Sequence, residues 1–140
     1  MSTIVEVTTD AQVAACHPVM AQLRPHIPAE GFVARVRQLE AGGYRLACVV
    51  EEGAVRAVAG FRVLDQLVRG RVLYVDDLVT DEQRRSRGHG DRLLSWLYER
   101  ARASGCSFLE LDSGTQRVDA HRFYARNRMT ISAFHFVRPC

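Results

Sequence analysis

A glycine-containing segment between a strand-like run and a helix-like run has the residue types that could hold a phosphate. It reads RSRGHG (Arg85 to Gly90) and lies between LYVDDLVT and an amphipathic, leucine-rich run. Gly88 and Gly90 lack a Cβ, so the backbone can approach a ligand closely. The first amides of a helix have no internal partner and favour an anion, to which Arg85 and Arg87 could add charge-assisted hydrogen bonds. The segment predicts a phosphate-binding loop; the alternative is a glycine turn with solvated arginines.

Two adjacent carboxylates, Asp76 and Asp77, interrupt an otherwise apolar strand-like run, GRVLYVDDLVT. Neighbouring residues on a strand point to opposite faces, so we expect at least one carboxylate to point toward a buried layer. An unpaired carboxylate there is destabilising or has a raised pKa. A bulge or a polar site in the sheet would accommodate it. The alternative is a pair of edge carboxylates that bind nearby arginines.

A third candidate lies in the short helix-like run AHRFYARNRM, residues 120–129. Phe123 and Tyr124 are large side chains for so short a helix. The Tyr124 hydroxyl could donate a proton in a reaction, or it could be a buried phenol with a hydrogen-bond partner. Taken alone, the residues favour the buried phenol.

The elements that must position these residues follow from hydrophobic periodicity and from turn residues. Asp10 is expected to cap the first helix. The expected order is β-α-α-β-β-β-α-β-α-β. A strand, a crossover helix and a further strand imply at least one parallel pair in a mixed α/β (α+β) sheet. Strands are expected over residues 3–9, 44–52, 55–64, 70–80, 106–113 and 130–137, and helices over 10–23, 29–41, part of 81–105, and 118–127.

Composition limits the classes of function. The 140 residues predict a single domain over residues 1–140, and 47% hydrophobic with 25% charged residues is ordinary for a soluble protein. No apolar run reaches the roughly 20 residues of a membrane span, and no signal peptide is recognisable, so we expect a cytoplasmic protein without a membrane partner. All 19 basic residues are arginines, which excludes a Walker-type lysine loop and a lysine nucleophile.

Metal and nucleic-acid binding are not expected. The four cysteines and five histidines have no metal-ligand spacing. The net charge of +3 is small, and acidic residues alternate with the arginines around the glycine segment, unlike a nucleic-acid-binding surface.

Together, DLVTDEQRRSRGHGDRLL and AHRFYARNRM resemble two motifs of the GNAT superfamily of acetyl-CoA-dependent N-acetyltransferases. Arg85-x-x-Gly88-x-Gly90 matches the family's pyrophosphate loop, and the second segment is similar to its Ala-x-x-Phe-Tyr segment. The resemblance covers nearly the whole chain. It implies a mostly antiparallel central sheet with helices on both faces. It also implies acetyl-CoA as co-substrate, with no metal, and a primary amine, small or on a peptide, as acceptor.

The resemblance also implies roles for individual residues. Backbone groups of Leu78, Val79 and Thr80 would bind the pantetheine arm, and the Val79 amide would stabilise the oxyanion. The amides implied to hold the pyrophosphate belong to Arg85, Ser86, Arg87, Gly88, His89 and Gly90. Tyr124 matches the family's frequent general acid, and His89 is expected beside a phosphate or in solvent.

The base is the least specified role. Asp77 is the first candidate, and Asp76, Glu110 and a water chain are the alternatives. The family's frequent Asn is replaced by Arg117, and the final hairpin is short or absent, so that a homodimer partner could complete the sheet. A catalytically silent acyl-CoA sensor or interaction module of the same fold is the competing hypothesis. The sequence leaves open the acceptor, and whether the acyl group is acetyl or longer.

Overall fold

The computed structural model describes residues 1–85 and 87–140. The chain divides into two compact units, Met1–Glu110 and Leu111–Cys140, which are described separately. The elements in chain order are β1 (Ser2–Glu6), α1 (Asp10–Leu23), α2 (Phe32–Glu40), β2 (Arg45–Glu51), β3 (Ala54–Gln66), β4 (Gly70–Thr80), a 3₁₀ turn η1 (Glu82–Arg84), α3 (His89–Ala103), β5 (Phe108–Leu111) and α4 (Val118–Arg126).

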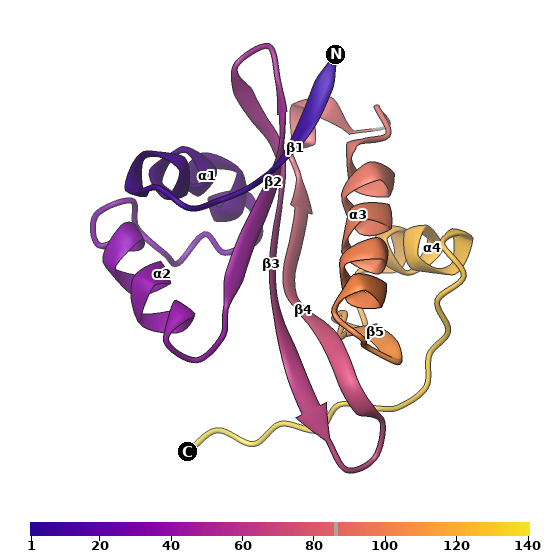
Figure 1. Cartoon of the computed structure of the whole chain (residues 1–140). Helices are drawn as coiled ribbons and strands as arrows, with labels where there is room; N and C mark the ends of the chain where they lie inside the picture. The colour runs from indigo at the N-terminus through magenta and orange to yellow at the C-terminus, as the bar shows by residue number, and fades with distance from the viewer. Residues whose placement is uncertain (86) are drawn as a thin grey trace. The chain divides into compact units, whose positions relative to one another are not determined.

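The first unit is built on a five-stranded sheet whose strand order follows the chain, β1-β2-β3-β4-β5. The first three pairings, β1 with β2, β2 with β3 and β3 with β4, are antiparallel. Helices α1 and α2 cover one face, and α3 covers the other (Figure 1). The expected fold class, a mixed and mostly antiparallel sheet with helices on both faces, is therefore confirmed. No helix among the described residues is long and apolar enough to cross a bilayer.

Both ends of α1 are set by local sequence signals. It begins at a capping box, in which the Thr9 hydroxyl accepts from the Gln12 amide and the Gln12 side chain accepts from the Thr9 amide. The N-cap is therefore Thr9. The prediction that Asp10 caps this helix was wrong, because Asp10 is already its first residue. Pro25 disfavours helical geometry for the residue before it, and Arg24 is the non-helical C-cap. The end of α1 therefore fixes the backbone position of Arg24.

Each face of the sheet has its own apolar layer. Under α1 and α2 the fully buried side chains include Val13, Cys16, Leu46 and Val58. On the other face Phe61 packs edge to face against Trp96 of α3, with a ring-centroid distance of 5.9 Å. These layers pack against β3 and β4 from both sides and thereby position the polar residues of these strands.

The second unit contains α4 and an extended C-terminal segment. The expected strand over residues 130–137 was wrong, because no strand is formed there. A strand requires a backbone partner, and residues 112–140 contribute no other strand with which it could pair. Its large apolar side chains are exposed: Ile131 84%, Phe134 82%, Phe136 90% and Val137 85%.

Candidate active site

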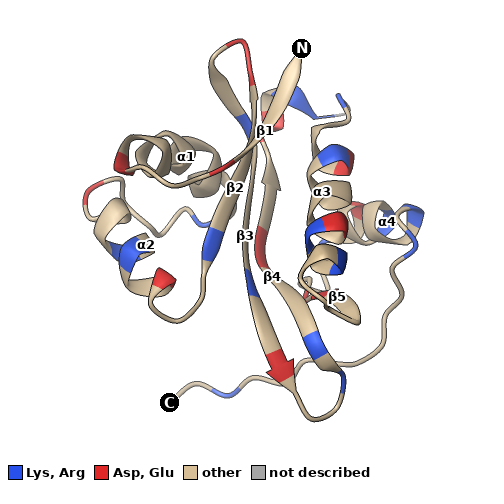
Figure 2. Cartoon of the chain, viewed as in Figure 1, with Lys and Arg blue, Asp and Glu red and all other residues tan. Residues whose placement is uncertain are grey.

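A β-bulge in β4 explains how the sheet accommodates the two adjacent carboxylates. Phe61 of β3 pairs with Val75 and Gly60 pairs with Asp77, which leaves Asp76 as the extra residue. Strict alternation is interrupted there, so Asp76 and Asp77 need not point to opposite faces. β4 lies between β3 and β5 and is not an edge strand. Figure 2 shows the resulting acidic band midway along β4.

Both carboxylates belong to one network of ion pairs and hydrogen bonds, hereafter the bulge cluster (Arg24, Tyr44, Arg62, Asp76 and Asp77). Arg24 Nε donates to Asp77 Oδ1 at 2.9 Å, and the Tyr44 hydroxyl donates to Asp77 Oδ2 at 2.7 Å. Arg62 Nε donates to Asp76 Oδ2 at 2.9 Å. The Arg62 guanidinium also lies 5.5 Å from the centre of the Tyr44 ring. The expected bulge and the expected pairing with arginines are both present, but the carboxylates do not lie on an edge strand.

Burial within the bulge cluster differs between its members. Tyr44 is 3% exposed, and burial followed by the Asp77 charge raises the pKa of its phenol, so the hydroxyl remains a donor. Burial also raises the pKa of Asp76, and the Arg62 hydrogen bond acts in the opposite direction. The side chain of Asp77 is 14% exposed, whereas that of Arg24 is 39% exposed. Arg24 is thus the cluster member nearest to solvent.

Gly60 is required for this packing. A Cβ at this position would lie 1.8 Å from the Tyr44 hydroxyl and 2.6 Å from Asp77 Oδ2. The backbone of β3 therefore makes room for the phenol and the carboxylate to meet.

The end of β4 directs its backbone groups in a defined pattern. The Asp81 amide donates to the Arg56 carbonyl at 2.8 Å, and the register from there back to Gly60 and Asp77 has no shift. Hydrogen bonding alternates along an antiparallel pair. The Val79 backbone therefore faces β3, whereas the backbone groups of Leu78 and Thr80 point away from it.

On the side of β4 away from β3, β5 pairs only near the start of β4. β5 has four residues, and Ser107, just before it, donates to the Arg71 carbonyl near the start of β4. β5 therefore does not reach Leu78 or Thr80, whose backbone groups can receive an extended ligand. The expectation that the Val79 amide faces the ligand was wrong, because that amide is directed at β3.

The start of α3 has the features of an anion site. Gly88 is the N-cap in the left-handed region, with φ of 80°, and no side chain caps the helix among the described residues. The first-turn amides are therefore available to an outside acceptor. Arg85 and Arg87 are exposed, and the described part of the chain offers neither an ion-pair partner. Ser86, also expected at this site, lies outside the described residues.

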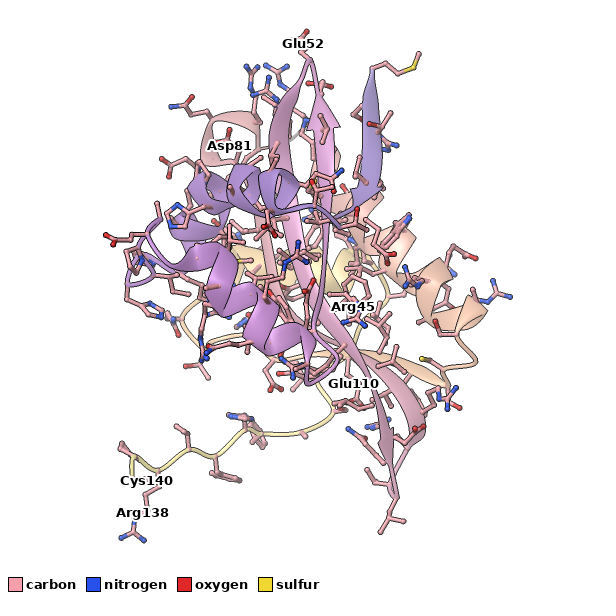
Figure 3. The ribbon with its side chains drawn as sticks, turned by 60° about the vertical axis from the view of Figure 1, so that its left-hand side comes forward. Arg45, Glu52, Asp81, Glu110, Arg138 and Cys140 are labelled. Carbon is pink, nitrogen blue, oxygen red and sulfur yellow. The ribbon has the colours of Figure 1, made fainter. Side chains whose placement is uncertain are left out.

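Beneath the start of α3 lies a buried and unsatisfied histidine. His89 is 3% exposed, and neither ring nitrogen has a hydrogen-bond partner among the described residues. The nearest carboxylate oxygen, on Glu51, is 3.8 Å from Nε2, too far for a hydrogen bond. His89 was expected beside a phosphate or in solvent; the second alternative was wrong, because the ring is buried near Glu51 of β2. Glu51 ends β2, and the next residue, Glu52, is labelled at the hairpin tip in Figure 3.

The other expected catalytic residues lie apart from the bulge cluster or in the second unit. Glu110 of β5 is bound to Arg69 at 3.0 Å, and no contact joins it to the cluster among the described residues. In the second unit, the Tyr124 ring packs against Phe123, with centroids 5.5 Å apart. Burial raises the pKa of Tyr124, and the Arg117 charge and hydrogen bond oppose this shift. Tyr124 as general acid stays a prediction.

Three members of the bulge cluster were not anticipated: Arg24, Tyr44 and Arg62. Arg24 and Asp77 are 53 positions apart in the sequence, and Tyr44 and Asp77 are 33 apart. The one local signal was the Arg24-Pro25 pair, since a residue before proline ends a helix.

The sheet, the bulge in β4 and the start of α3, which no described side chain caps, match the arrangement expected for an acyl-CoA-dependent acyltransferase. The chain belongs to the acetyltransferase (GNAT) family, whose model matches residues 14–128. The expected family and enzyme class are thus confirmed.

Relatives and solved structures agree with this assignment. A protein of Bacillus subtilis (strain 168) named as an uncharacterized N-acetyltransferase, YhdJ, is 34% identical over 136 residues, which cover 96% of each chain. Glucosamine 6-phosphate N-acetyltransferase 1 of Oryza sativa subsp. japonica is 38% identical over 96 residues, or 63% of this chain and 58% of the relative. The crystal structure of a ribosomal-protein-alanine N-acetyltransferase from Brucella melitensis biovar Abortus 2308 covers 100% of both chains with a TM-score of 0.85 at 17% identity, which supports the fold alone.

Proposed function

We propose that this protein transfers the acetyl group of acetyl-CoA to the primary amine of a small molecule by direct attack in a ternary complex. Two features carry the proposal: the start of α3, which no described side chain caps and which suits a pyrophosphate, and the partly buried carboxylate pair at the bulge in β4. The name of the rice relative, a glucosamine 6-phosphate acetyltransferase, favours a small acceptor over a protein.

The residues present fit acetyl-CoA. The first-turn amides of α3, with Arg85 and Arg87, suit a pyrophosphate because they offer donors and positive charge to the same anion. The outward backbone groups of Leu78 and Thr80 suit the amide groups of a pantetheine arm. Acetyl-CoA supplies the acetyl group as a thioester.

The chain's residues then have separate tasks in the transfer. Asp77 accepts a proton from the acceptor ammonium, with Asp76, whose pKa burial raises, as the competing base. The freed amine nitrogen bonds to the carbonyl carbon as the carbon–sulfur bond breaks. The Leu78 amide donates to the carbonyl oxygen as it gains negative charge. Tyr124 gives its proton to the departing thiolate, so that neutral thiol leaves, and the second proton that the nitrogen loses on becoming an amide restores the phenol.

The experiment is incubation of the purified protein with acetyl-CoA and a panel of primary amines, with acetylated products identified by mass spectrometry. The proposal expects product for at least one amine, and loss of turnover in Tyr124→Phe with acetyl-CoA binding retained. The competing hypothesis, a silent acyl-CoA-binding module, is favoured if acetyl-CoA binds but no amine in the panel is acetylated. The chain has no lysine, so acetylation of its own lysines cannot confuse the measurement.

A further inference from the structure

The bulge cluster is electrically balanced, which restricts the acceptor. It holds two arginines and two aspartates, and each carboxylate is bound to a guanidinium at 2.9 Å. Two adjacent carboxylates without partners would favour a cationic acceptor. With its arginines counted, the cluster offers no surplus negative charge to a simple ammonium ion.

Arg24 occupies the position at Asp77 that an ammonium group would need. Its Nε donates to Asp77 Oδ1, and its second terminal nitrogen donates to the Asp76 carbonyl at 3.0 Å. The other hydrogen-bond partner of Asp77, the Tyr44 hydroxyl, is buried and fixed beside Gly60. A substrate ammonium that approaches Asp77 Oδ1 therefore competes with Arg24 for the same oxygen.

Arg24 is also the cluster member best able to exchange partners. It is the C-cap of α1, immediately before Pro25, and its side chain is 39% exposed. If an ammonium ion without an anionic group displaced Arg24 from Asp77, the guanidinium would lie beside a new positive charge and would lack its carboxylate partner. An amine that also carries an anionic group would offer Arg24 a replacement partner, and the number of ion pairs would not fall.

We propose that Arg24 is a specificity-determining residue that exchanges Asp77 for an anionic group of the acceptor. The acceptor class is therefore a small zwitterion, with a carboxylate, sulfonate or phosphonate a few bonds from its primary amine. This inference rests on the proposed acetyl transfer, since it names the acceptor of the same site.

The test compares acceptors of similar size with and without an anionic group. The acceptors are 2-aminoethylphosphonate, 2-aminoethanesulfonate and β-alanine against n-propylamine, with kcat/KM measured from the acetylated product. The wild-type protein should prefer at least one zwitterion by about tenfold or more, the range expected for hydrogen bonds between charged groups. Arg24→Gln should reduce this preference to about one, because kcat/KM falls more for the zwitterion than for n-propylamine.

The matched control is Arg35→Gln, which removes an exposed arginine of α2 whose side chain donates only to Gln38 among the described contacts. It should leave the preference intact. Equal loss for every amine in Arg24→Gln would show a merely structural role and overturn the inference. Acetylation of amines with no preference for zwitterions would also overturn it, while the proposed function would stand.

A binding measurement separates the two proposals if no acceptor is acetylated. Calorimetric titration of the CoA-bound protein with 2-aminoethylphosphonate should give binding that Arg24→Gln weakens by about tenfold and Arg35→Gln does not change. Such binding without transfer would support the recognition site and contradict the proposed reaction. Absence of zwitterion binding together with absence of transfer would contradict both.

Discussion

The bulge cluster and the start of α3 differ in whether their polar groups have partners within the protein. At the bulge, every carboxylate has a charged partner, and the Tyr44 hydroxyl donates to Asp77 at 2.7 Å. At the start of α3, the described residues leave the helix uncapped, and both nitrogens of the buried His89 lack a hydrogen-bond partner. The difference indicates that the bulge is organised before a ligand arrives. The start of α3 keeps first-turn amides that no described side chain caps.

The largest expected effect comes from removing the charge at the centre of the bulge. Asp77→Asn should lower kcat/KM by roughly 10²- to 10⁴-fold, the usual contribution of a general base. The measurement is initial-rate acetylation of the preferred amine. Asp65→Asn is the control, because Asp65 also binds an arginine of β4 but its side chain is 72% exposed. A near-normal rate in Asp77→Asn with a large loss in Asp76→Asn would transfer the role of base to Asp76.

The second prediction concerns the space within the organised bulge. Gly60→Ala should lower the free energy of unfolding by about 1–3 kcal/mol, because the added Cβ cannot coexist with the buried Tyr44 hydroxyl. Urea denaturation measures the change. Gly42→Ala is the matched control, since its nearest contact would be an ordinary 3.5 Å, and it should change stability much less. Equal effects of the two substitutions would contradict the tight packing.

The third prediction uses two glycines with the same local geometry. Gly31 caps α2 with φ of 82°, and Gly88 caps α3 with φ of 80°; neither has an atom within 4 Å of an added Cβ. Alanine at either position should lower stability by about 1–2 kcal/mol through the left-handed backbone. Only Gly88→Ala should also weaken acetyl-CoA binding, by several-fold in calorimetry. Equal affinities in both variants would argue against an anion site at α3.

The smallest effect is expected at His89, whose buried ring nitrogens have no hydrogen-bond partner in residues 1–85 and 87–140. His89→Leu should leave the stability of the ligand-free protein unchanged or raise it by up to about 1 kcal/mol, because an apolar side chain removes unsatisfied polar atoms. Chemical denaturation without ligand measures it. A loss above about 2 kcal/mol would mean that the ring makes important interactions in the folded protein.

Local sequence patterns predicted the parts of the molecule that local interactions form. Periodicity located α1, β4 and α3, and the glycines located the start of α3, because each pattern reports on its own neighbours in the chain. The expected strand over residues 130–137 failed because alternation indicates a tendency to pair but supplies no partner.

The members of the bulge cluster lay beyond this reasoning. The carboxylates were visible in the sequence, but their partners come from the end of α1, the residue before β2 and the middle of β3. The bulge shifts the register by one residue, which no period-two pattern reveals. The sequence therefore located the two adjacent carboxylates, whereas their ion-pair and hydrogen-bond partners could be identified only from the fold.

The start of α3 is proposed to hold the pyrophosphate of acetyl-CoA. A thermal-shift titration of the wild-type protein and Gly88→Asp with acetyl-CoA, with adenosine diphosphate as a second ligand, tests it most directly. A ligand at about one hundred times its dissociation constant should stabilise the folded protein by roughly 2.7 kcal/mol. The account predicts a clear rise in melting temperature with acetyl-CoA for the wild-type protein, and its loss in Gly88→Asp. No shift at millimolar acetyl-CoA, or an equal shift in both proteins, would contradict it.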